Sequence, residues 1–282
     1  DIKHNFKLLK MKNCFFLISA LIIGLSSCDQ IEEGNFIDGD GPSTAEGVLR
    51  KVLIEDFTGH KCQNCPKAAE ELHAIQEAFP EQVVGIAIHA GYFAVPNPSA
   101  APYLTTDFRT EEGTEIHDFF GPEAYPVGMV DRNAYPNVLL NYEDWNSIVV
   151  AHSGMESAEL KIDLSHNRVD DFLTMDVTVT GVKACSGEHK LVVCITEDNI
   201  VDWQTVEGEG NVEDYEHNHV LRNVVNGTWG EEIGSISIDQ DIIGQFSCTL
   251  DVAWVFENCN IVAYVYHPMD YQVVQVEEAN IN

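Results

Sequence analysis

The stretch Gly59–Phe79, GHKCQNCPKAAEELHAIQEAF, places two cysteines at the start of a helical pattern. The apolar residues that follow them recur at helical spacing: Ala68, Leu72, Ile75 and Phe79. Pro80 predicts the end of this helix. The run VLRKVLIEDFTG precedes the cysteines and the run QVVGIAIHA follows the helix, and both are typical of buried strands. The stretch therefore predicts a strand–helix–strand unit with parallel strands, with the cysteines between the first strand and the helix.

The spacing of Cys62 and Cys65 suits three kinds of chemistry. A cysteine reacts as a thiolate, and the N-terminus of a helix lowers the thiol pKa through its free N–H groups and its dipole. An active dithiol/disulfide pair is therefore the first interpretation, and a structural disulfide is the second. The third is a metal site, for which His60 adds a ligand, although the sequence has no second CxxC to complete a structural zinc site.

If the pair is redox-active, we expect Cys62 to attack a substrate and Cys65 to resolve the mixed disulfide. His60 and Lys61 precede Cys62 directly. The positive charge of Lys61 would favour a thiolate next to it, so both residues are predicted to tune Cys62.

The segment DYEHNHVLR is a second candidate site, because it holds His217 and His219 two residues apart. On a strand these two side chains would share one face and could bind a metal. No third ligand is fixed by the spacing, so a packed or hydrogen-bonded turn is the favoured interpretation. We therefore predict no metal and no cofactor. The weaker metal candidates are His60, Cys62, Cys65, His217 and His219.

The composition limits the classes of partner. The 282 residues are 45% hydrophobic, which is enough for a packed core, and carry a formal charge of −31. A protein that binds DNA or RNA needs Lys and Arg to neutralise phosphates, so nucleic acid is excluded as a partner.

The N-terminal residues have the pattern of an export signal. Met11 and Lys12 lead into the apolar run CFFLISALIIGL, and small residues follow it. This run is too short to span a bilayer, which needs about 20 apolar residues. We predict a signal peptide over residues 1–27. The signal proper is residues 11–27, and residues 1–10 are interpreted as upstream sequence that precedes the true start at Met11. Leu25-Ser26-Ser27-Cys28 resembles a bacterial lipobox, which implies cleavage before Cys28 and a lipid on its thiol.

The rest of the chain is predicted to form an acidic tether and two domains. Residues 28–47 are polar, acidic and Gly-rich, as in a flexible tether. Residues 48–155 are predicted to be an α/β domain, with further helices in TEIHDFFG and EDWNSIVVAHSG and a strand in AYPVGMVDR. The long connection at 91–113 is predicted to be functional. From residue 156 to 282 the hydrophobic pattern alternates, which predicts an all-β antiparallel sandwich, immunoglobulin-like in type.

The alternating segments of this second domain are AELKIDL, LTMDVTVT, SCTLDVAWVF, NIVAYVYH and YQVVQV. In SCTLDVAWVF the predicted inward residues are Leu250, Val252, Trp254 and Phe256. The chain has eight cysteines, and four of them lie in this domain: Cys185, Cys194, Cys248 and Cys259. In an oxidising compartment we expect one or two structural disulfides among these four, and the spacing does not decide their pairing.

The order strand, CxxC, helix, strand, and a later strand entered through Pro126, is similar to the thioredoxin fold. The resemblance covers about residues 48–154. It implies that Asp56, six residues before Cys62, is a buried proton acceptor for the second cysteine. It also implies that Pro126 is a cis-proline that contacts a bound peptide.

The chain resembles the outer-membrane protein 28 family of bacterial lipoproteins in a set of motifs and in their order. These motifs are a lipobox, FTGHKCQNCP, DFRT, YPVGMVDR and HNHVLR. The resemblance covers essentially the whole chain after the signal. It implies a thioredoxin-like domain followed by a β-rich domain, anchored to the outer membrane through Cys28 and facing the periplasm or the cell surface.

The motif departs from thioredoxins in two places. Lys61 stands where they have Trp, and Gln63-Asn64 stand where they have Gly-Pro. Two functions are therefore expected: a thiol-disulfide oxidoreductase that acts on envelope proteins or peptides, or a non-catalytic binding or adhesion lipoprotein with a structural or metal-binding CxxC.

Overall fold

Strand β1 (Val52–Thr58) is the element around which the N-terminal half assembles. The computed structural model describes residues 47–153 and 158–282. The described residues belong to one compact unit, Ala45–Asn282. The predicted signal peptide, the lipidation site Cys28 and nearly all of the tether lie outside the described residues.

The helices are α1 (Cys65–Ala78), α2 (Gly91–Ala94), α3 (Glu111–Phe120) and α4 (Tyr142–Ser153), with 3-10 turns η1 (Pro98–Ala100) and η2 (Phe256–Asn258). The first half adds two strands to β1, namely β2 (Val83–His89) and β3 (Val127–Val130). The second half contains β4 (Leu160–Val169), β5 (Phe172–Gly181), β6 (His189–Glu197), β7 (Ile200–Val206), β8 (Gly210–His217), β9 (Val220–Val224), β10 (Glu231–Gly234), β11 (Asp241–Thr249), β12 (Cys259–Tyr266) and β13 (Val273–Asn280).

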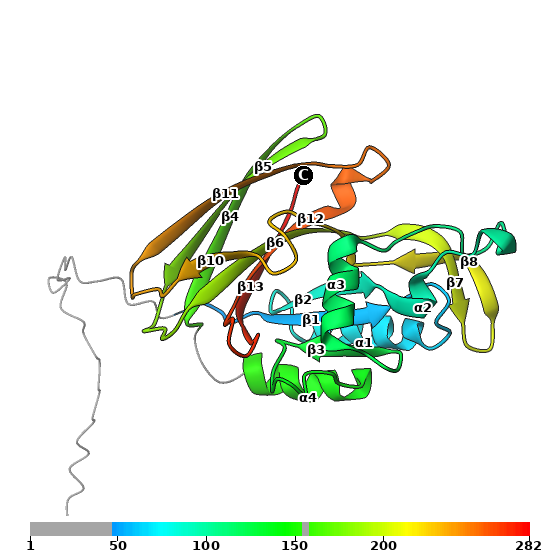
Figure 1. The fold of residues 1–282 in the computed structure, drawn as a ribbon, viewed down its shortest axis with the longest axis horizontal. Helices are drawn as coiled ribbons and strands as arrows, with labels where there is room; N and C mark the ends of the chain where they lie inside the picture. Colours follow the sequence, from blue (N-terminus) through cyan, green and yellow to red (C-terminus); the bar gives the residue numbers. More distant parts are fainter. Residues whose placement is uncertain (1–46, 154–157) are drawn as a thin grey trace, which may run out of the picture. The chain divides into compact units, whose positions relative to one another are not determined.

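One mixed sheet runs through both halves, in the order β13-β12-β6-β9-β2-β1-β3, with β10 paired to β6 (Figure 1). β1 and β2 are parallel, as predicted, and β3 is antiparallel to β1. β9 lies parallel to β2 and antiparallel to β6, so it joins the N-terminal strands to the C-terminal ones. A three-stranded sheet β11-β5-β4 and a two-stranded hairpin β7-β8 complete the strands.

The residues of β1 pack alternately on the two faces of the large sheet, because successive side chains of a strand point to opposite sides. Leu53 and Phe57 belong to a core that includes Ile116 of α3, Leu221 of β9 and Tyr264 of β12. On the other face, the core made by β1 with α1 and α4 consists of Val52, Ile54, Ala68, Leu72, Ile75, Val83, Val130, Trp145 and Val149. Both faces of β1 are buried, which explains its continuous apolar sequence.

The C-terminal strands are buried on both faces as well. In β6, Val192 and Cys194 face the first core, whereas Leu191, Val193 and Ile195 pack against the three-stranded sheet. The predicted β-rich second part is therefore present, and its antiparallel sheet β11-β5-β4 covers the end of the large sheet (Figure 1). The predicted boundary near residue 155 falls within the undescribed residues 154–157, and it stays a prediction. Strands from both sides of it share one sheet.

Two details of the prediction are wrong. The strand expected through Phe256 ends at Thr249, and Val252 is 80% exposed because a turn follows the strand. The four cysteines of the second half are free thiols rather than disulfides. Cys194 faces the first core, while Cys185, Cys248 and Cys259 pack in the second one, so the sheet itself separates Cys194 from the others. Burial raises the pKa of Cys185 and Cys248 to about 11, which keeps these thiols unreactive.

Among the described residues, no helix combines the length and the apolar character that a bilayer span requires.

Candidate functional site

Cys62 and Cys65 form a disulfide directly after β1, with their Cα atoms 5.4 Å apart. A tight turn sets up the motif, in which the Cys62 amide donates to the Gly59 carbonyl at 2.9 Å. The helix α1 begins at Cys65, so Cys62 lies three residues before the helix and not within its first turn. Pro66 occupies the first turn of the helix, where its missing N–H costs no helical hydrogen bond.

The disulfide is covered. Cys62 is 3% exposed and Cys65 is 2% exposed. The hairpin β7–β8, here called the covering hairpin, hydrogen-bonds to the CxxC motif along its length. The Thr205 amide donates to the His60 carbonyl at 2.8 Å, and the Glu207 amide donates to the Gln63 carbonyl at 2.9 Å. A thiol reagent therefore reaches the sulfurs only if this cover moves.

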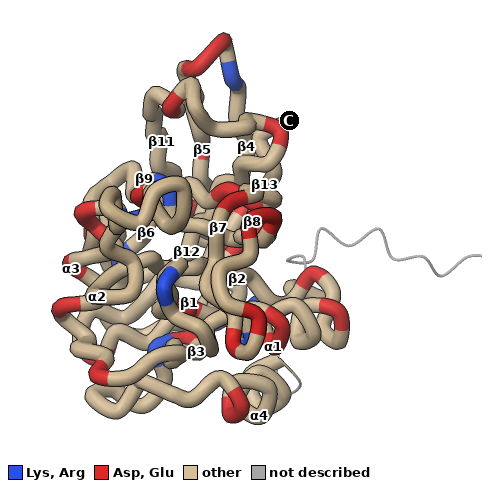
Figure 2. The backbone as a smooth tube through the Cα atoms, turned by 90° about the vertical axis from the view of Figure 1, so that its right-hand side faces the viewer, with Lys and Arg blue, Asp and Glu red and all other residues tan. Residues whose placement is uncertain are grey.

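Side chains add to this cover. Gln204 Nε2 donates to the carbonyl of Cys62 at 2.9 Å, and Gln204 is itself buried. Lys67 of α1 pairs with Glu207 near the tip of the hairpin. Figure 2 shows the hairpin running beside α1, and acidic positions outnumber basic ones along the chain.

The segment around α2 covers the motif from another side. The Lys61 amide donates to the Phe93 carbonyl at 3.0 Å, and the Lys61 ammonium lies 4.6 Å from the centre of the Tyr92 ring. Gly59 is required here, because a Cβ atom at this position would lie 2.5 Å from the Phe93 carbonyl carbon. The long connection predicted at 91–113 is thus part of the site.

Asp56 of β1 is buried behind the disulfide at 3% exposure. Burial raises the pKa of Asp56 to about 7, and the nearby His219 opposes part of this increase. Asp56 and Cys65 line the same cavity of about 30 Å³, here called the disulfide cavity. The structure therefore brings together three of the predicted residues, Asp56, Cys62 and Cys65.

The other predicted residues are placed as follows. His60 is buried beside the motif, and burial lowers its pKa. Partial burial lowers the pKa of Lys61. The Tyr125–Pro126 peptide bond is cis, and Pro126 directly precedes Val127, which pairs with Phe57 of β1.

The two histidines of DYEHNHVLR separate. His217 ends β8 and lines the disulfide cavity, whereas His219 lies in the turn after it, with a φ of 58°. His219 Nδ1 is 3.1 Å from Asp198 Oδ1, and His219 Nε2 is 3.1 Å from Gln76 Oε1. The predicted hydrogen-bonded turn therefore describes His219 well. In the described part of the chain, no three His, Cys, Asp or Glu side chains are arranged to hold a metal ion.

Three further members of this site were not predicted. His89 ends β2, Phe108 lies in the connection before α3, and Gln204 lies on the covering hairpin. The Phe108 ring centre is 5.0 Å from both His89 and His217 and 6.3 Å from His60. We call His60, His89 and His217 around this ring the histidine cluster. Only a polar residue at the end of the apolar run QVVGIAIHA marks His89 in the sequence.

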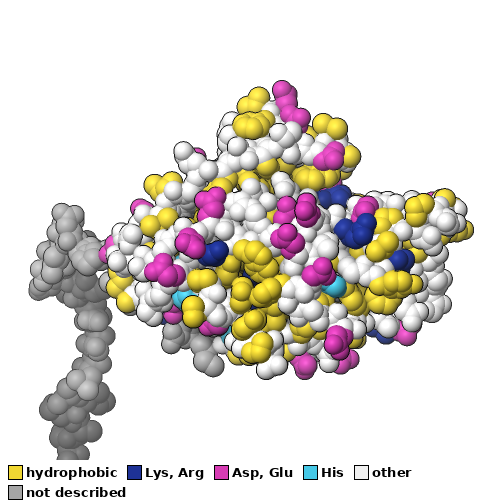
Figure 3. Space-filling view, viewed as in Figure 1, with side chains coloured by type: hydrophobic (Ala, Val, Ile, Leu, Met, Phe, Trp, Pro, Cys, Tyr) yellow, Lys and Arg dark blue, Asp and Glu magenta, His cyan; other side chains and the backbone are white. Residues whose placement is uncertain are grey.

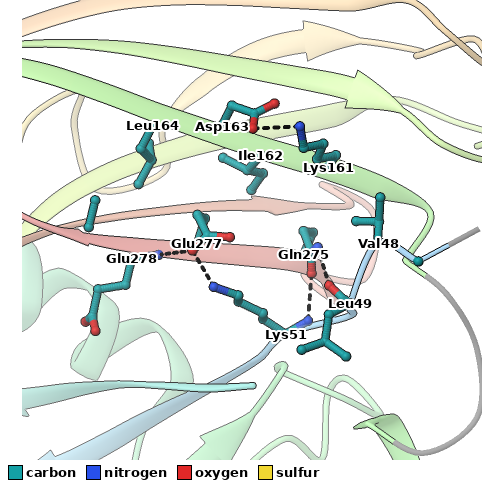
Figure 4. Close-up of a pocket in the computed structure, with 12 residues that line it drawn as sticks. Val48, Leu49, Lys51, Lys161, Ile162, Asp163, Leu164, Gln275, Glu277 and Glu278 are labelled. Atoms are coloured by element: carbon teal, nitrogen blue, oxygen red, sulfur yellow. Dashed lines mark hydrogen bonds and ion pairs between the residues drawn. The ribbon is translucent and has the colours of Figure 1, made fainter. Parts of the chain in front are cut away.

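A separate pocket of about 380 Å³ lies between the segment before β1, β4 and β13 (Figure 4). Four of its charged side chains form two ion pairs, Lys51 with Glu277 and Lys161 with Asp163. It shares no lining residue with the disulfide cavity.

Comparison with known proteins places the chain in a family. The sequence model described as outer membrane protein Omp28 matches residues 114–282. The chain belongs to the Omp28 family. This confirms the predicted family and its location in the outer membrane. No curated protein matches the chain.

Solved structures resemble the Omp28-family fold described here. HBP35 of Porphyromonas gingivalis superposes with a TM-score of 0.64 at 16% identity, over 83% of this chain and 76% of that one. A protein of Agrobacterium tumefaciens gives a TM-score of 0.52 at 16% identity, over 83% of this chain and 96% of that one. A domain of the outer membrane lipoprotein Omp28 from Porphyromonas gingivalis is 24% identical over 45% of this chain and 92% of that one, with a TM-score of 0.33. At these identities, the first two matches establish a shared fold and nothing more.

Proposed function

We propose that this Omp28-family protein is a thiol-disulfide oxidoreductase of the cell envelope, anchored by a lipid on Cys28. The observation that carries the proposal is the position of the Cys62–Cys65 disulfide, between β1 and α1 and next to the buried acid Asp56. A redox pair needs a group that accepts the proton of the second thiol. A carboxyl group with a pKa of about 7 can do so at neutral pH.

The order of elements around the pair supports a thioredoxin-like assignment for residues 48–155. The parallel strands β1 and β2 are joined through α1, the antiparallel strand β3 follows beside β1, and α4 packs on the same face as α1. In this assignment Cys62 attacks the substrate, Cys65 resolves the mixed disulfide, and Pro126 lies where a peptide would be bound.

The burial of both sulfurs adds a condition to this function. Because the covering hairpin hydrogen-bonds to His60, Cys62 and Gln63, a protein substrate would have to displace it before Cys62 could attack. We therefore expect a gated enzyme, slow with large substrates until the hairpin opens.

The test uses two cysteine variants of the full chain. Cys62→Ser is expected to abolish insulin reduction, because no attacking sulfur is left. Cys65→Ser is expected to trap mixed disulfides, because the resolving thiol is missing. If both variants reduced insulin as fast as the parent chain, the catalytic proposal would be wrong.

The same burial favours a second candidate, a non-catalytic binding lipoprotein with a structural disulfide. Its binding surface would be the aromatic cluster formed by Phe119, Tyr135, Trp229 and Tyr271, whose ring centres are 4.8 to 5.8 Å apart. Phe119 and Tyr135 are 43% and 42% exposed, and hydrophobic side chains gather near the middle of the face drawn in Figure 3. Partner binding that survives the Cys62→Ser/Cys65→Ser double substitution would favour this candidate.

A further inference from the structure

The disulfide cavity is lined by several side chains that can exchange protons. A disulfide that only stabilises the fold would not need them. The cavity lies between α1, the ends of β1 and β2, and the covering hairpin, and its lining includes Asp56, Cys65, His89 and His217. The His89 and His217 rings are 5.8 Å apart. One of these histidines comes from the sheet and the other from the cover.

Three polar atoms of these residues are buried and have no hydrogen-bond partner among the described residues. They are Asp56 Oδ1, His89 Nδ1 and His217 Nε2. A buried polar atom without a partner destabilises a fold, so several such atoms around one cavity call for a ligand or for water. The cavity of about 30 Å³ has room for water, which needs roughly 10–15 Å³ and two or more polar partners.

The two imidazoles of His89 and His217 are in the charge state that the transfer of a proton from group to group requires. Burial lowers the pKa of His217 to about 4, and burial lowers the pKa of His89 well below its ordinary value. Both rings are therefore neutral at pH 7. A neutral imidazole accepts a proton at one nitrogen and releases one from the other, so it can pass protons on.

We propose that His89 and His217 relay protons between the Cys65 thiol and Asp56 through the disulfide cavity. The proposal deepens the thiol-disulfide function proposed above and rests on it. His89 and His217 are positioning residues, because neither touches the substrate and each acts through Cys65 and Asp56, between which it passes the proton.

The step they serve is the resolution of a mixed disulfide. The Cys65 thiol gives up its proton to the cavity, and its sulfur forms a bond to the Cys62 sulfur. The bond between Cys62 and the substrate sulfur breaks at the same time, and the substrate leaves as a thiolate. That thiolate takes up one proton, so one S–S bond is made, one is broken, and the substrate disulfide is the oxidant.

Asp56 also gives the path an outlet, because it lines a second cavity of about 340 Å³ as well. That cavity is lined by further titratable groups, which are His73, Asp198, Glu216 and His219. The charged and titratable groups that act on the relay residues come from several elements: His60 before α1, Asp202 of β7, Tyr215 of β8, His219 after β8 and Arg222 of β9.

The experiment follows a single turnover of the reduced full chain with oxidised glutathione between pH 6 and pH 9. Quenched samples report two rates, the formation of the Cys62–glutathione mixed disulfide and its resolution. In His89→Gln and His217→Gln we expect resolution to slow on the order of 100-fold, at the low end of general acid–base effects, while formation is unchanged. The rate is expected to rise with pH as Asp56 ionises.

His166→Gln is the matched control, because this histidine of β4 lies on the three-stranded sheet and lines neither cavity, so its variant should match the parent chain. A merely structural effect of His217→Gln would loosen the covering hairpin and would therefore speed both rates. Faster or unchanged resolution in both variants would overturn the relay while leaving the proposed function intact.

Two other outcomes have defined meanings. If the parent chain forms no mixed disulfide at any pH, the proposed function fails and the relay fails with it. If stoichiometric zinc or copper is bound by the reduced parent chain and lost in His217→Gln, the cavity is a metal site and the relay is wrong.

Discussion

Asp56 is the side chain on whose protonation the proposed chemistry depends most directly. It is fully enclosed, and burial raises its pKa to about 7, so near neutral pH it exists in both the acid and the carboxylate form. The positive charge that His219 acquires next to Asp198 acts in the opposite direction on Asp56. A neighbour outside the motif thus helps to set how readily Asp56 takes up a proton.

The raised pKa of Asp56 predicts that the free energy of unfolding depends on pH. Between about pH 4 and pH 7 the folded state holds a proton on Asp56 that the unfolded state has lost, so the free energy of unfolding falls as the pH rises through this range. Asp56→Asn removes the titration and should remove roughly 2.5–3 kcal/mol of the loss that falls between pH 5 and pH 8. Urea denaturation at pH 5 and pH 8 measures it.

The control for this prediction is Asp214→Asn, an exposed aspartate on β8, which should keep the pH dependence of the parent chain. If Asp56→Asn lost as much stability between pH 5 and pH 8 as the parent chain does, then Asp56 would not carry the raised pKa.

At the residue scale, the sequence predicted the members of the site that lie close to the motif. Asp56, Cys62 and Cys65 fall within ten residues of each other, so the periodicity of one strand and one helix brings them together. His89, Phe108 and Gln204 are distant in sequence, and they reach the disulfide only through strand pairing and loop packing. No local pattern encodes such contacts.

The covering hairpin is the element that controls access to the disulfide. Its hydrogen bonds to the motif come from two backbone amides and from Gln204. The segment was predicted only as a site of histidines. Its strands β7 and β8 form a sheet of their own, and sequence pattern does not reveal where such a hairpin will pack.

Gln204→Ala should weaken this cover. The variant loses the hydrogen bonds that Gln204 donates to the carbonyls of Cys62 and Thr205, at 2.9 and 3.0 Å. One such bond contributes about 1 kcal/mol, so we expect dithiothreitol to reduce the disulfide roughly 5- to 10-fold faster. Glu213→Gln, an exposed change on the same hairpin, should leave the rate unchanged. Equal rates in all three chains would mean that opening of the hairpin does not limit reduction.

Acid should open the same hairpin. The pKa of His217 is about 4 when the hairpin is closed, mainly through burial, and it returns towards 6.5 when the hairpin opens into water. The open state then binds more protons, so closure is most stable above pH 6.5 and weakens as the pH falls towards 4. His60 and Arg222 favour the neutral ring in the closed state, and Asp202 opposes them.

The measurement is the rate at which a phosphine reduces the disulfide, corrected for the titration of the phosphine. It should rise by up to about tenfold per pH unit below pH 6.5, and less in His217→Gln. A corrected rate that is flat from pH 7 to pH 4 would contradict the acid-opening account.

At the scale of the whole molecule, the shared sheet ties the two predicted domains together. Arg132, which follows β3, makes two hydrogen bonds of 2.7 Å to Glu55 of β1 and one of 2.9 Å to the Tyr264 hydroxyl of β12. All three side chains are buried. A buried ion pair is costly to expose or to break, so this contact holds the N-terminal and C-terminal strands in one register.

The shared sheet predicts that residues 48–155 do not fold alone. Without β9 the edge of β2 is unpaired, and the core of β1 loses its partners in β6, β9, β12 and β13. We expect this fragment to show no cooperative thermal transition by circular dichroism, whereas residues 45–282 unfold in one. A cooperative transition of the fragment would instead support the predicted independent domain.

Features that depend on residues close together in the sequence could be predicted, whereas contacts between residues far apart in the sequence could not. The α/β unit and the β-rich second part follow from hydrophobic periodicity, which is a local signal. The joining of β2 to β9 is not predictable in this way, because it brings together residues more than 130 positions apart, such as Ala87 and Val220. Cys194 follows the same rule, since the face of the sheet that it occupies separates it from the other three free cysteines.

We propose above that the buried Cys62–Cys65 disulfide is a working redox pair. The decisive measurement is its reduction potential in the full chain, obtained by equilibration with defined thiol/disulfide buffers. We predict reversible exchange and a potential above about −300 mV, within reach of cellular exchange partners. A potential well below that value, with no exchange after Gln204→Ala has loosened the cover, would identify a structural bridge and contradict the account.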